Sequence, residues 1–248
     1  MDYKKEIIKK INNMSGSQSV YNIFADWIKM LALAISNTME FYEKIYDKRE
    51  NEYKGIAAKY TDKELNEFTV LNVLLTQAFE ERFEDVLGYI YMNLQVSNKN
   101  LGQFFTPYHL CRVMAEMSYP ERIKEGYYIE VSEPSCGAGA NIIALAEALK
   151  SKDINYQETM KVTCQDLDWN AIYMCYVQMS LYGIAATVVQ GDTLLNPYVG
   201  GYNEHVFITP VLRLNDWKFR NKKRLVEEPE SGVWKLATDE EGQMRLIM

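Results

Sequence analysis

A hydrophobic segment followed by a glycine-rich turn and a helical segment constrains the fold of this chain more than any other feature. Tyr127–Val131 is rich in aromatic and β-branched residues, the turn is Glu133-Pro-Ser-Cys-Gly-Ala-Gly139, and Asn141–Leu149 has a helical composition. Gly137 and Gly139 allow a tight turn and a close approach to a ligand, and the helix presents free N–H groups at its start. This order is typical of nucleotide pockets, and it also occurs as a plain connection between a strand and a helix.

Alternating strand and helix segments predict an α/β fold. Strands are expected at 127–131, 161–165, 187–190 and 204–209, with helices over 141–149 and 170–181 between the first three. Such alternation favours a parallel, doubly wound sheet, in which ligands bind beyond the carboxyl ends of the strands. Acidic residues follow two of these strands, in Asp166-Leu-Asp168 and in Gly191-Asp192-Thr193. Taken singly, each acid can instead cap a helix.

The first hundred residues read as a helical domain, and residues 101–248 as a second, α/β domain. Apolar residues at spacings of three and four predict a helix from Ser19 to about Tyr60. Thr61 and Glu64 form a capping box that starts the next helix. After Thr106-Pro107, a helix is expected over 108–117.

The composition indicates in which cellular compartment the chain is expected to work. The chain is 48% hydrophobic and 25% charged, which is ordinary for a soluble protein, and it has neither a membrane-length apolar run nor a secretory signal. Four cysteines without a C-x-x-C spacing suggest no zinc site and no disulfide framework, so we expect no metal and a reducing cytoplasm.

The net charge of -7 argues against a surface that binds nucleic acid everywhere. One local cationic segment could follow a phosphate backbone, or it could be a solvated loop. Its cations are Lys218, Arg220, Lys222, Lys223 and Arg224.

Two motifs in order carry a family resemblance. Gly102-Gln-Phe-Phe-Thr-Pro107 precedes Glu133-Pro-Ser-Cys-Gly-Ala-Gly139, and this pair resembles the S-adenosylmethionine-dependent DNA adenine-N6 methyltransferases, most of all the modification subunits of type I restriction systems. The resemblance covers about 85–212. It implies a Rossmann-like class I methyltransferase fold with a doubly wound, mostly parallel sheet after a helical N-terminal domain, and S-adenosylmethionine as cofactor.

The resemblance also implies roles for individual residues. The first motif would cover the methionine end of the cofactor, and the glycine loop would hold its amino acid and ribose. Asp166 would accept the ribose hydroxyls, Asp168 would cap a helix or make a secondary contact, and Asp192 would accept from the adenine amino group. The cofactor-binding residues so implied are Phe105, Thr106, Pro107, Glu133, Ser135, Gly137, Gly139, Asp166, Asp192 and Thr193.

The family's catalytic motif is Asn or Asp-Pro-Pro-aromatic, placed after the fourth strand. Its polar oxygens accept hydrogens from the adenine amine, and its aromatic ring stacks on the flipped base. By register this position holds Thr209-Pro-Val-Leu212, so Thr209 and Pro210 are the predicted, degenerate catalytic residues. A rival is Asn196-Pro197-Tyr198, which lacks one proline. Because it follows Asp192 so closely, it would have to fold back over the pocket as a loop.

By this resemblance the chain after Leu212 is short for a complete methyltransferase sheet. Residues 233–248 can form a hairpin that turns at 239–242, but no separate target-recognition domain fits. DNA would then be read by the helical part, by the cationic segment, by a partner chain such as a specificity subunit, or within a homo-oligomer.

His109 and His205 are expected to be packed or surface residues rather than bases.

Three functions stay open from the sequence. The first is adenine-N6 methylation of DNA. The second is a catalytically inactive, binding or regulatory relative in a restriction-modification or phage context. The third is methylation of another acceptor.

Overall fold

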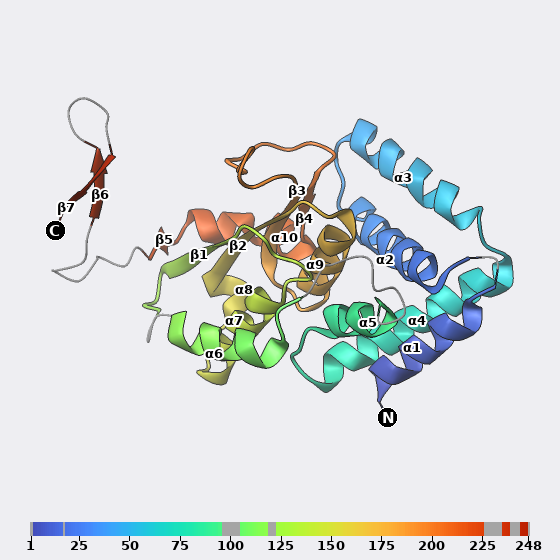
Figure 1. Ribbon diagram of the computed structural model, residues 1–248. Coiled ribbons are helices and arrows are strands. Elements are labelled where there is room, and N and C mark those ends of the chain that lie inside the picture. Colours follow the sequence, from blue (N-terminus) through green and yellow to red (C-terminus); the bar gives the residue numbers. More distant parts are fainter. Residues whose placement is uncertain are drawn as a thin grey trace.

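The computed structural model describes residues 2–16, 18–95, 105–118, 123–225, 235–238 and 244–247, which fold as the α/β protein that the sequence predicts (Figure 1). A five-stranded sheet has the order β4-β3-β2-β1-β5. The strands are β1 (Tyr127–Glu133), β2 (Met160–Asp166), β3 (Ala185–Gln190), β4 (Val206–Ile208) and β5 (Lys223–Arg224).

The sheet is mostly parallel, as expected. β1, β2 and β3 run parallel to one another, and β5 runs parallel to β1. β4 pairs antiparallel with β3, in a register that places Ile208 opposite Thr187. No helix separates these two strands, so the chain returns through residues 191–205 at the same edge, and an antiparallel pair results. The end of β4 therefore lies beside the start of β3.

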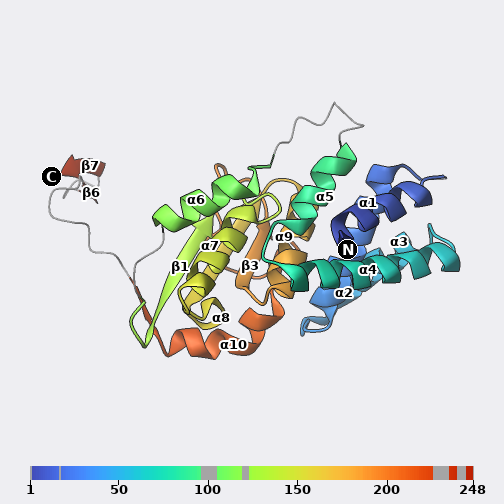
Figure 2. The same cartoon turned by 90° about the horizontal axis from the view of Figure 1, so that it is seen from below.

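Helices cover both faces of this sheet. α7 (Ala140–Ser151) and α9 (Trp169–Leu181) connect successive parallel strands, so right-handed crossovers place both on one face. α10 (Pro210–Arg220) lies on the other face, near the amino ends of the strands (Figure 2), where the rings of Phe219 and Tyr128 pack edge to face with their centres 5.4 Å apart. Two further helices are α6 (Tyr108–Ser118) and the short α8 (Tyr156–Thr159).

The described residues between 3 and 95 form helices joined by short connections, as predicted, and these helices gather beside α9 (Figure 1). Buried side chains of this part and of the sheet form one continuous hydrophobic cluster, which runs from Ile7 to Phe207. The helices are α1 (Tyr3–Met14), α2 (Val20–Asn37), α3 (Glu43–Ala57), α4 (Asp62–Glu81) and α5 (Val86–Gln95).

The single helix expected from Ser19 to Tyr60 is wrong, because the chain breaks between α2 and α3. The carboxylate of Glu40 accepts hydrogen bonds from the backbone of Phe41 and Tyr42, which turns the chain. The same buried carboxylate then pairs with Arg49 of α3 at 2.8 Å, so it fixes the second helix against the first. The capping box of Thr61 and Glu64 is confirmed.

The predicted terminal hairpin is confirmed in its strands. β6 (Lys235–Thr238) and β7 (Met244–Ile247) pair antiparallel, whereas the expected turn at 239–242 lies outside the described residues. Among the helices of the described segments, none has the length and apolar character needed to cross a bilayer.

Candidate functional site

The glycine-rich turn after β1 adopts the backbone conformation that its glycines allow. Gly137 has φ 52° and Gly139 has φ 97°, both in the region that side chains disfavour. Gly139 is the N-cap of α7, so the first N–H groups of that helix face the carboxyl edge of the sheet. Cys136 N–H donates to Gln165 O at 3.0 Å, which ties the turn to the end of β2.

Asp166 at the end of β2 orients this turn. Its Oδ2 accepts from Gly137 N–H at 2.8 Å, and its Oδ1 accepts from Asp168 N–H at 3.0 Å. A carboxylate has about four lone-pair positions, so each oxygen can still accept a ligand hydroxyl. Asp168 accepts from Ala171 N–H and caps α9, as predicted.

Glu133 and Ser135 lie where the turn begins. Asn141 Nδ2, in the first turn of α7, donates to Glu133 Oε2 at 3.0 Å, and Ser135 N–H reaches Glu133 Oε1 at 3.4 Å. These contacts aim the Glu133 carboxylate along the loop. Its charge therefore lies beside free N–H groups at the start of α7, which stabilise an acid there.

The segment that follows β3 also lies at the carboxyl edge of the sheet, next to the glycine loop. Asp192 Oδ1 accepts from the backbone N–H groups of Leu194 and Leu195 at 2.9 and 3.1 Å, so the carboxylate shapes its own turn. Thr193 Oγ1 donates to Pro134 O at 2.6 Å and joins this turn to the glycine loop. Leu167 is 66% exposed and offers an apolar surface next to these acids.

The described part of the first motif lies just before α6, and its Phe105 contacts the same glycine loop. The ring of Phe105 packs over Gly137, since a Cβ built there would lie 3.1 Å from two ring carbons. Thr106 and Pro107 line a cavity of about 420 Å³ between α5 and α6. The structure thus brings Phe105 to the glycine loop, while residues 102–104 of the motif lie outside the described residues.

A buried glutamine on α9 links the helical part to the loop. Gln178 is fully buried, and its Nε2 donates to Ala138 O at 2.8 Å and to Asp85 Oδ1 at 2.7 Å. Its Oε1 accepts from Leu87 N–H at the start of α5. Sequence reasoning missed Gln178, because nothing in its local sequence separates it from the other residues of an apolar helix.

The Asn196-Pro197-Tyr198 segment folds back to the carboxyl edge. Gln165, next to Asp166, donates from Nε2 to Asn196 O and accepts at Oε1 from Tyr198 N–H, both at 2.9 Å. Tyr198 OH also donates to Gly201 O at 2.7 Å. The segment therefore lies beside the end of β2, and nothing in the local sequence marks Gln165 as the residue that holds it there.

Thr209 and Pro210 lie at the opposite edge. Thr209 is fully buried; its Oγ1 donates to Ile184 O at 2.8 Å and accepts from Ala186 N–H at 2.9 Å. Pro210 starts α10. Because β4 is antiparallel, its end meets the amino end of β3, so the structure does not bring these two residues to the cofactor motifs.

The predicted cationic segment also lies near the amino edge, on the last turn of α10 and on β5. Lys218 and Lys222 pair with Glu158, at 2.8 and 4.0 Å. Arg220 pairs with Asp216 and Arg224 with Glu130, and Lys223 is exposed. Most of this charge is matched by nearby acids.

Neither histidine is placed as a base. His205 Nδ1 lies 2.8 Å from Gln190 Oε1, and its ring lies against Trp169. His109 is exposed at the rim of the cavity beside Phe105.

Fold and site together define a class: an α/β protein whose glycine loop and strand-end acids meet at the carboxyl edge of parallel strands, where such folds bind ligands. Residues 79–233 match the family model of the N-6 DNA methylases, and the chain belongs to that family.

Two solved structures resemble the chain. One is the methyltransferase subunit of a type I restriction-modification system from Streptococcus thermophilus, with 18% identity and a TM-score of 0.41 over 80% of this chain and 41% of that one. The other, from Listeria monocytogenes, is described as a class I S-adenosylmethionine-dependent methyltransferase, with 13% identity and a TM-score of 0.42 over 79% of this chain and 55% of that one. The chain thus spans roughly half the length of each. Among curated proteins no match was found.

Proposed function

We propose that the chain binds S-adenosylmethionine at the carboxyl edge of β1, β2 and β3, and that it methylates N6 of adenine in DNA. Membership of the N-6 DNA methylase family supports the reaction. The meeting of the glycine loop with Asp166 and Asp192 at one edge supports the cofactor.

The residues present fit this cofactor. The ring of Phe105 packs directly on the backbone of Gly137, where a Cβ would lie 3.1 Å from it, and gives the glycine loop a flat apolar neighbour. Asp166 keeps acceptor capacity for ribose hydroxyls, and Glu133 offers a carboxylate for the cationic amino-acid end. Asp192 Oδ2 is available for an adenine amine, beside the exposed Leu167. S-adenosylmethionine supplies an electrophilic methyl group when it is bound.

We assign the acceptor side of the pocket to Asn196-Pro197-Tyr198 in place of Thr209-Pro210. The observation that carries this assignment is the pair of hydrogen bonds from Gln165, which hold the segment next to Asp166. The Asn196 amide oxygen can accept a hydrogen of the adenine amine, which makes the nitrogen lone pair more available. Tyr198 supplies the aromatic ring that a flipped base requires. Thr209 has its hydroxyl committed to the backbone.

The test offers labelled S-adenosylmethionine and unmethylated DNA to the wild-type protein and to three variants. We expect label on adenine with the wild type, loss of that label in Asn196→Ala, and retention in Thr209→Ser, which keeps the buried hydroxyl. Asn196→Asp keeps an acceptor oxygen and should retain part of the activity. Label that survives Asn196→Ala would contradict the assignment.

A second candidate function is cofactor binding without transfer. The segment at 196–198 lacks one proline of the family motif, and the register position for catalysis is buried at Thr209. Saturable binding of S-adenosylmethionine with no label on DNA would favour this candidate. If the methyl group is transferred to DNA only after a partner chain such as a specificity subunit is added, DNA recognition belongs to that partner.

A further inference from the structure

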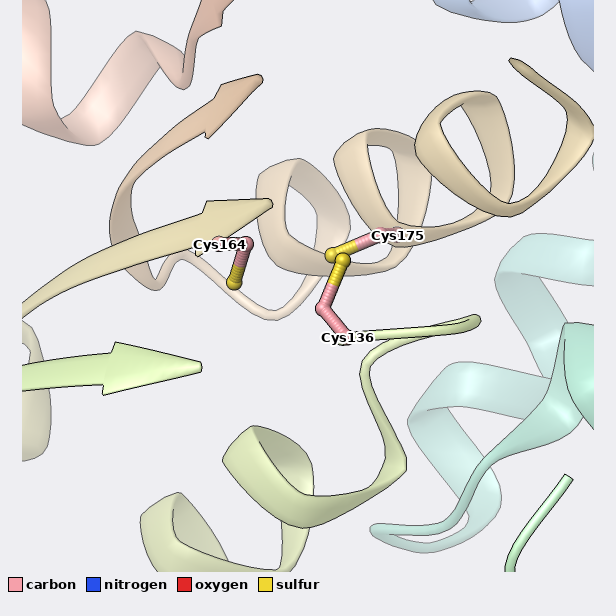
Figure 3. A group of neighbouring side chains, drawn as sticks. All are labelled: Cys136, Cys164 and Cys175. Carbon is pink, nitrogen blue, oxygen red and sulfur yellow. The ribbon is translucent and has the colours of Figure 1, made fainter. Parts of the chain in front are cut away.

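Three cysteines from three separate elements meet beneath the glycine loop. Cys136 belongs to the loop itself, Cys164 to β2 and Cys175 to α9, and their Sγ atoms all lie within 4.8 Å of one another (Figure 3). All three are buried. The fourth cysteine, Cys111 on α6, is also buried but directs its thiol to Thr106 O.

The cluster is chemically unlike a set of packed apolar side chains. The contacts of the Cys164 thiol with Cys136 and Cys175 lower the pKa of Cys164, although burial opposes this. The contact with Cys164 raises the pKa of Cys136, and the contacts with Cys136 and Cys164 raise the pKa of Cys175. Three sulfur atoms this close together can be presented to one ion, and cysteine binds metals through its sulfur once the thiol proton has left.

We propose that Cys136, Cys164 and Cys175 form a binding site for a thiophilic divalent metal ion of the Zn²⁺ and Cd²⁺ class. With metal–sulfur bonds of about 2.3 Å, ligand sulfurs lie about 3.8 Å apart, so the cluster needs to contract by about 1 Å or less. Sulfur is the ligand type that selects such ions over Mg²⁺ or Ca²⁺. The proposal does not depend on the assigned methylation function.

The binding step balances in charge and protons. Three metal–sulfur bonds form, and each S–H bond still present breaks and releases its proton to solvent, without any change of oxidation state. Three thiolates around a divalent ion leave one net negative charge. That charge lies close to the N-terminus of α7, whose free N–H groups favour it.

Metal binding would hold the glycine loop in place. Cys136 directly precedes Gly137, and the Cys175 Sγ lies 3.3 Å from the position that a Cβ would occupy on Gly139. A shared ion would therefore hold the loop to β2 and α9 at once. We expect the amides of residues 136–139 to exchange more slowly with deuterium in the metal-bound protein.

The test titrates Cd²⁺ into the fully reduced, full-length protein and follows the ultraviolet thiolate-to-cadmium charge-transfer band. We expect one retained ion per chain after desalting, and an X-ray absorption spectrum dominated by sulfur neighbours. Cys164→Ala and Cys175→Ala should abolish the band, whereas the matched control Cys111→Ala should keep it. Circular dichroism checks that each variant folds.

If the variants do not fold, the absorption spectra of the wild-type protein with Cd²⁺ still test the proposal. A first coordination shell of oxygen or nitrogen, loss of the ion on desalting, or an unchanged band in Cys164→Ala would overturn the proposal. So would a disulfide between two of the three cysteines that persists in the presence of reductant, since it would remove the ligands.

Discussion

Replacing Thr209 by valine tests whether this residue serves the fold or the reaction. Valine has nearly the same shape but no hydroxyl, so Ala186 N–H loses its acceptor and Ile184 O loses a donor, both in a fully buried site. Each buried group left without a partner costs about 1–3 kcal/mol. Two such groups cost about 2–6 kcal/mol together. Because the backbone bond from Thr209 N–H to Ala186 O remains and limits the disturbance, we expect the free energy of unfolding to fall by the lower part of this range, about 2–4 kcal/mol.

Equilibrium unfolding in urea, followed by circular dichroism, measures this change. With an m-value of about 3 kcal/mol/M, the midpoint should fall by about 1 M. Thr209→Ser keeps both hydrogen bonds and loses only a methyl group, which should cost about 1 kcal/mol. Wild-type stability in Thr209→Val would refute the structural role of the hydroxyl. Loss of methylation in a Thr209→Ser variant that is folded under the assay conditions would contradict the assignment of the reaction to residues other than Thr209.

Three further predictions follow from single contacts. Gly139→Ala should lose about 1–3 kcal/mol of stability in thermal denaturation, because φ 97° strains alanine and its Cβ would lie 2.7 Å from the Met179 side chain. Gln165→Leu should speed deuterium exchange at the backbone N–H of Tyr198, which loses its acceptor, while distant amides keep their rates. Burial raises the pKa of Asp85 above its ordinary 3.8, so the folded state holds that proton more tightly than the unfolded chain does. The free energy of unfolding should therefore fall as pH rises from about 3.8 through the raised pKa, and Asp85→Asn should remove that slope in urea titrations at several pH values.

Local sequence was sufficient where local chemistry decides the structure. The glycine turn, the capping box at Thr61 and the cap at Asp168 each depend on residues within a few positions. The alternation of strands and helices also predicted the parallel part of the sheet, because a crossover helix leaves parallel strands as the favoured result.

The features that the sequence did not predict depend on contacts between residues far apart in the chain. The direction of β4 depends on how residues 191–205 return to the sheet, and this direction moves Thr209 to the amino edge. The break between α2 and α3 depends on the buried pair of Glu40 with Arg49. Each of these features joins residues whose separation in the chain carries no periodic signal.

The same limit applies to the site. Gln165 and Gln178 are buried amides whose partners lie far away in the chain, so their roles emerge only from the folded structure. The three clustered cysteines have no metal-type spacing in the sequence, and they meet because the loop, β2 and α9 converge. By contrast, the acids at strand ends were predictable, since parallel strands share one carboxyl edge.

The cofactor site at the carboxyl edge is the central claim, and calorimetric titration of S-adenosylmethionine tests it most directly. We predict saturable binding to the wild type and a loss of roughly thirtyfold in affinity, about 2 kcal/mol, in Asp192→Ala. Asp216→Ala, which removes a carboxylate at the amino edge, should bind as the wild type does. No heat of binding with the wild type, or equal losses in the two variants, would contradict the account.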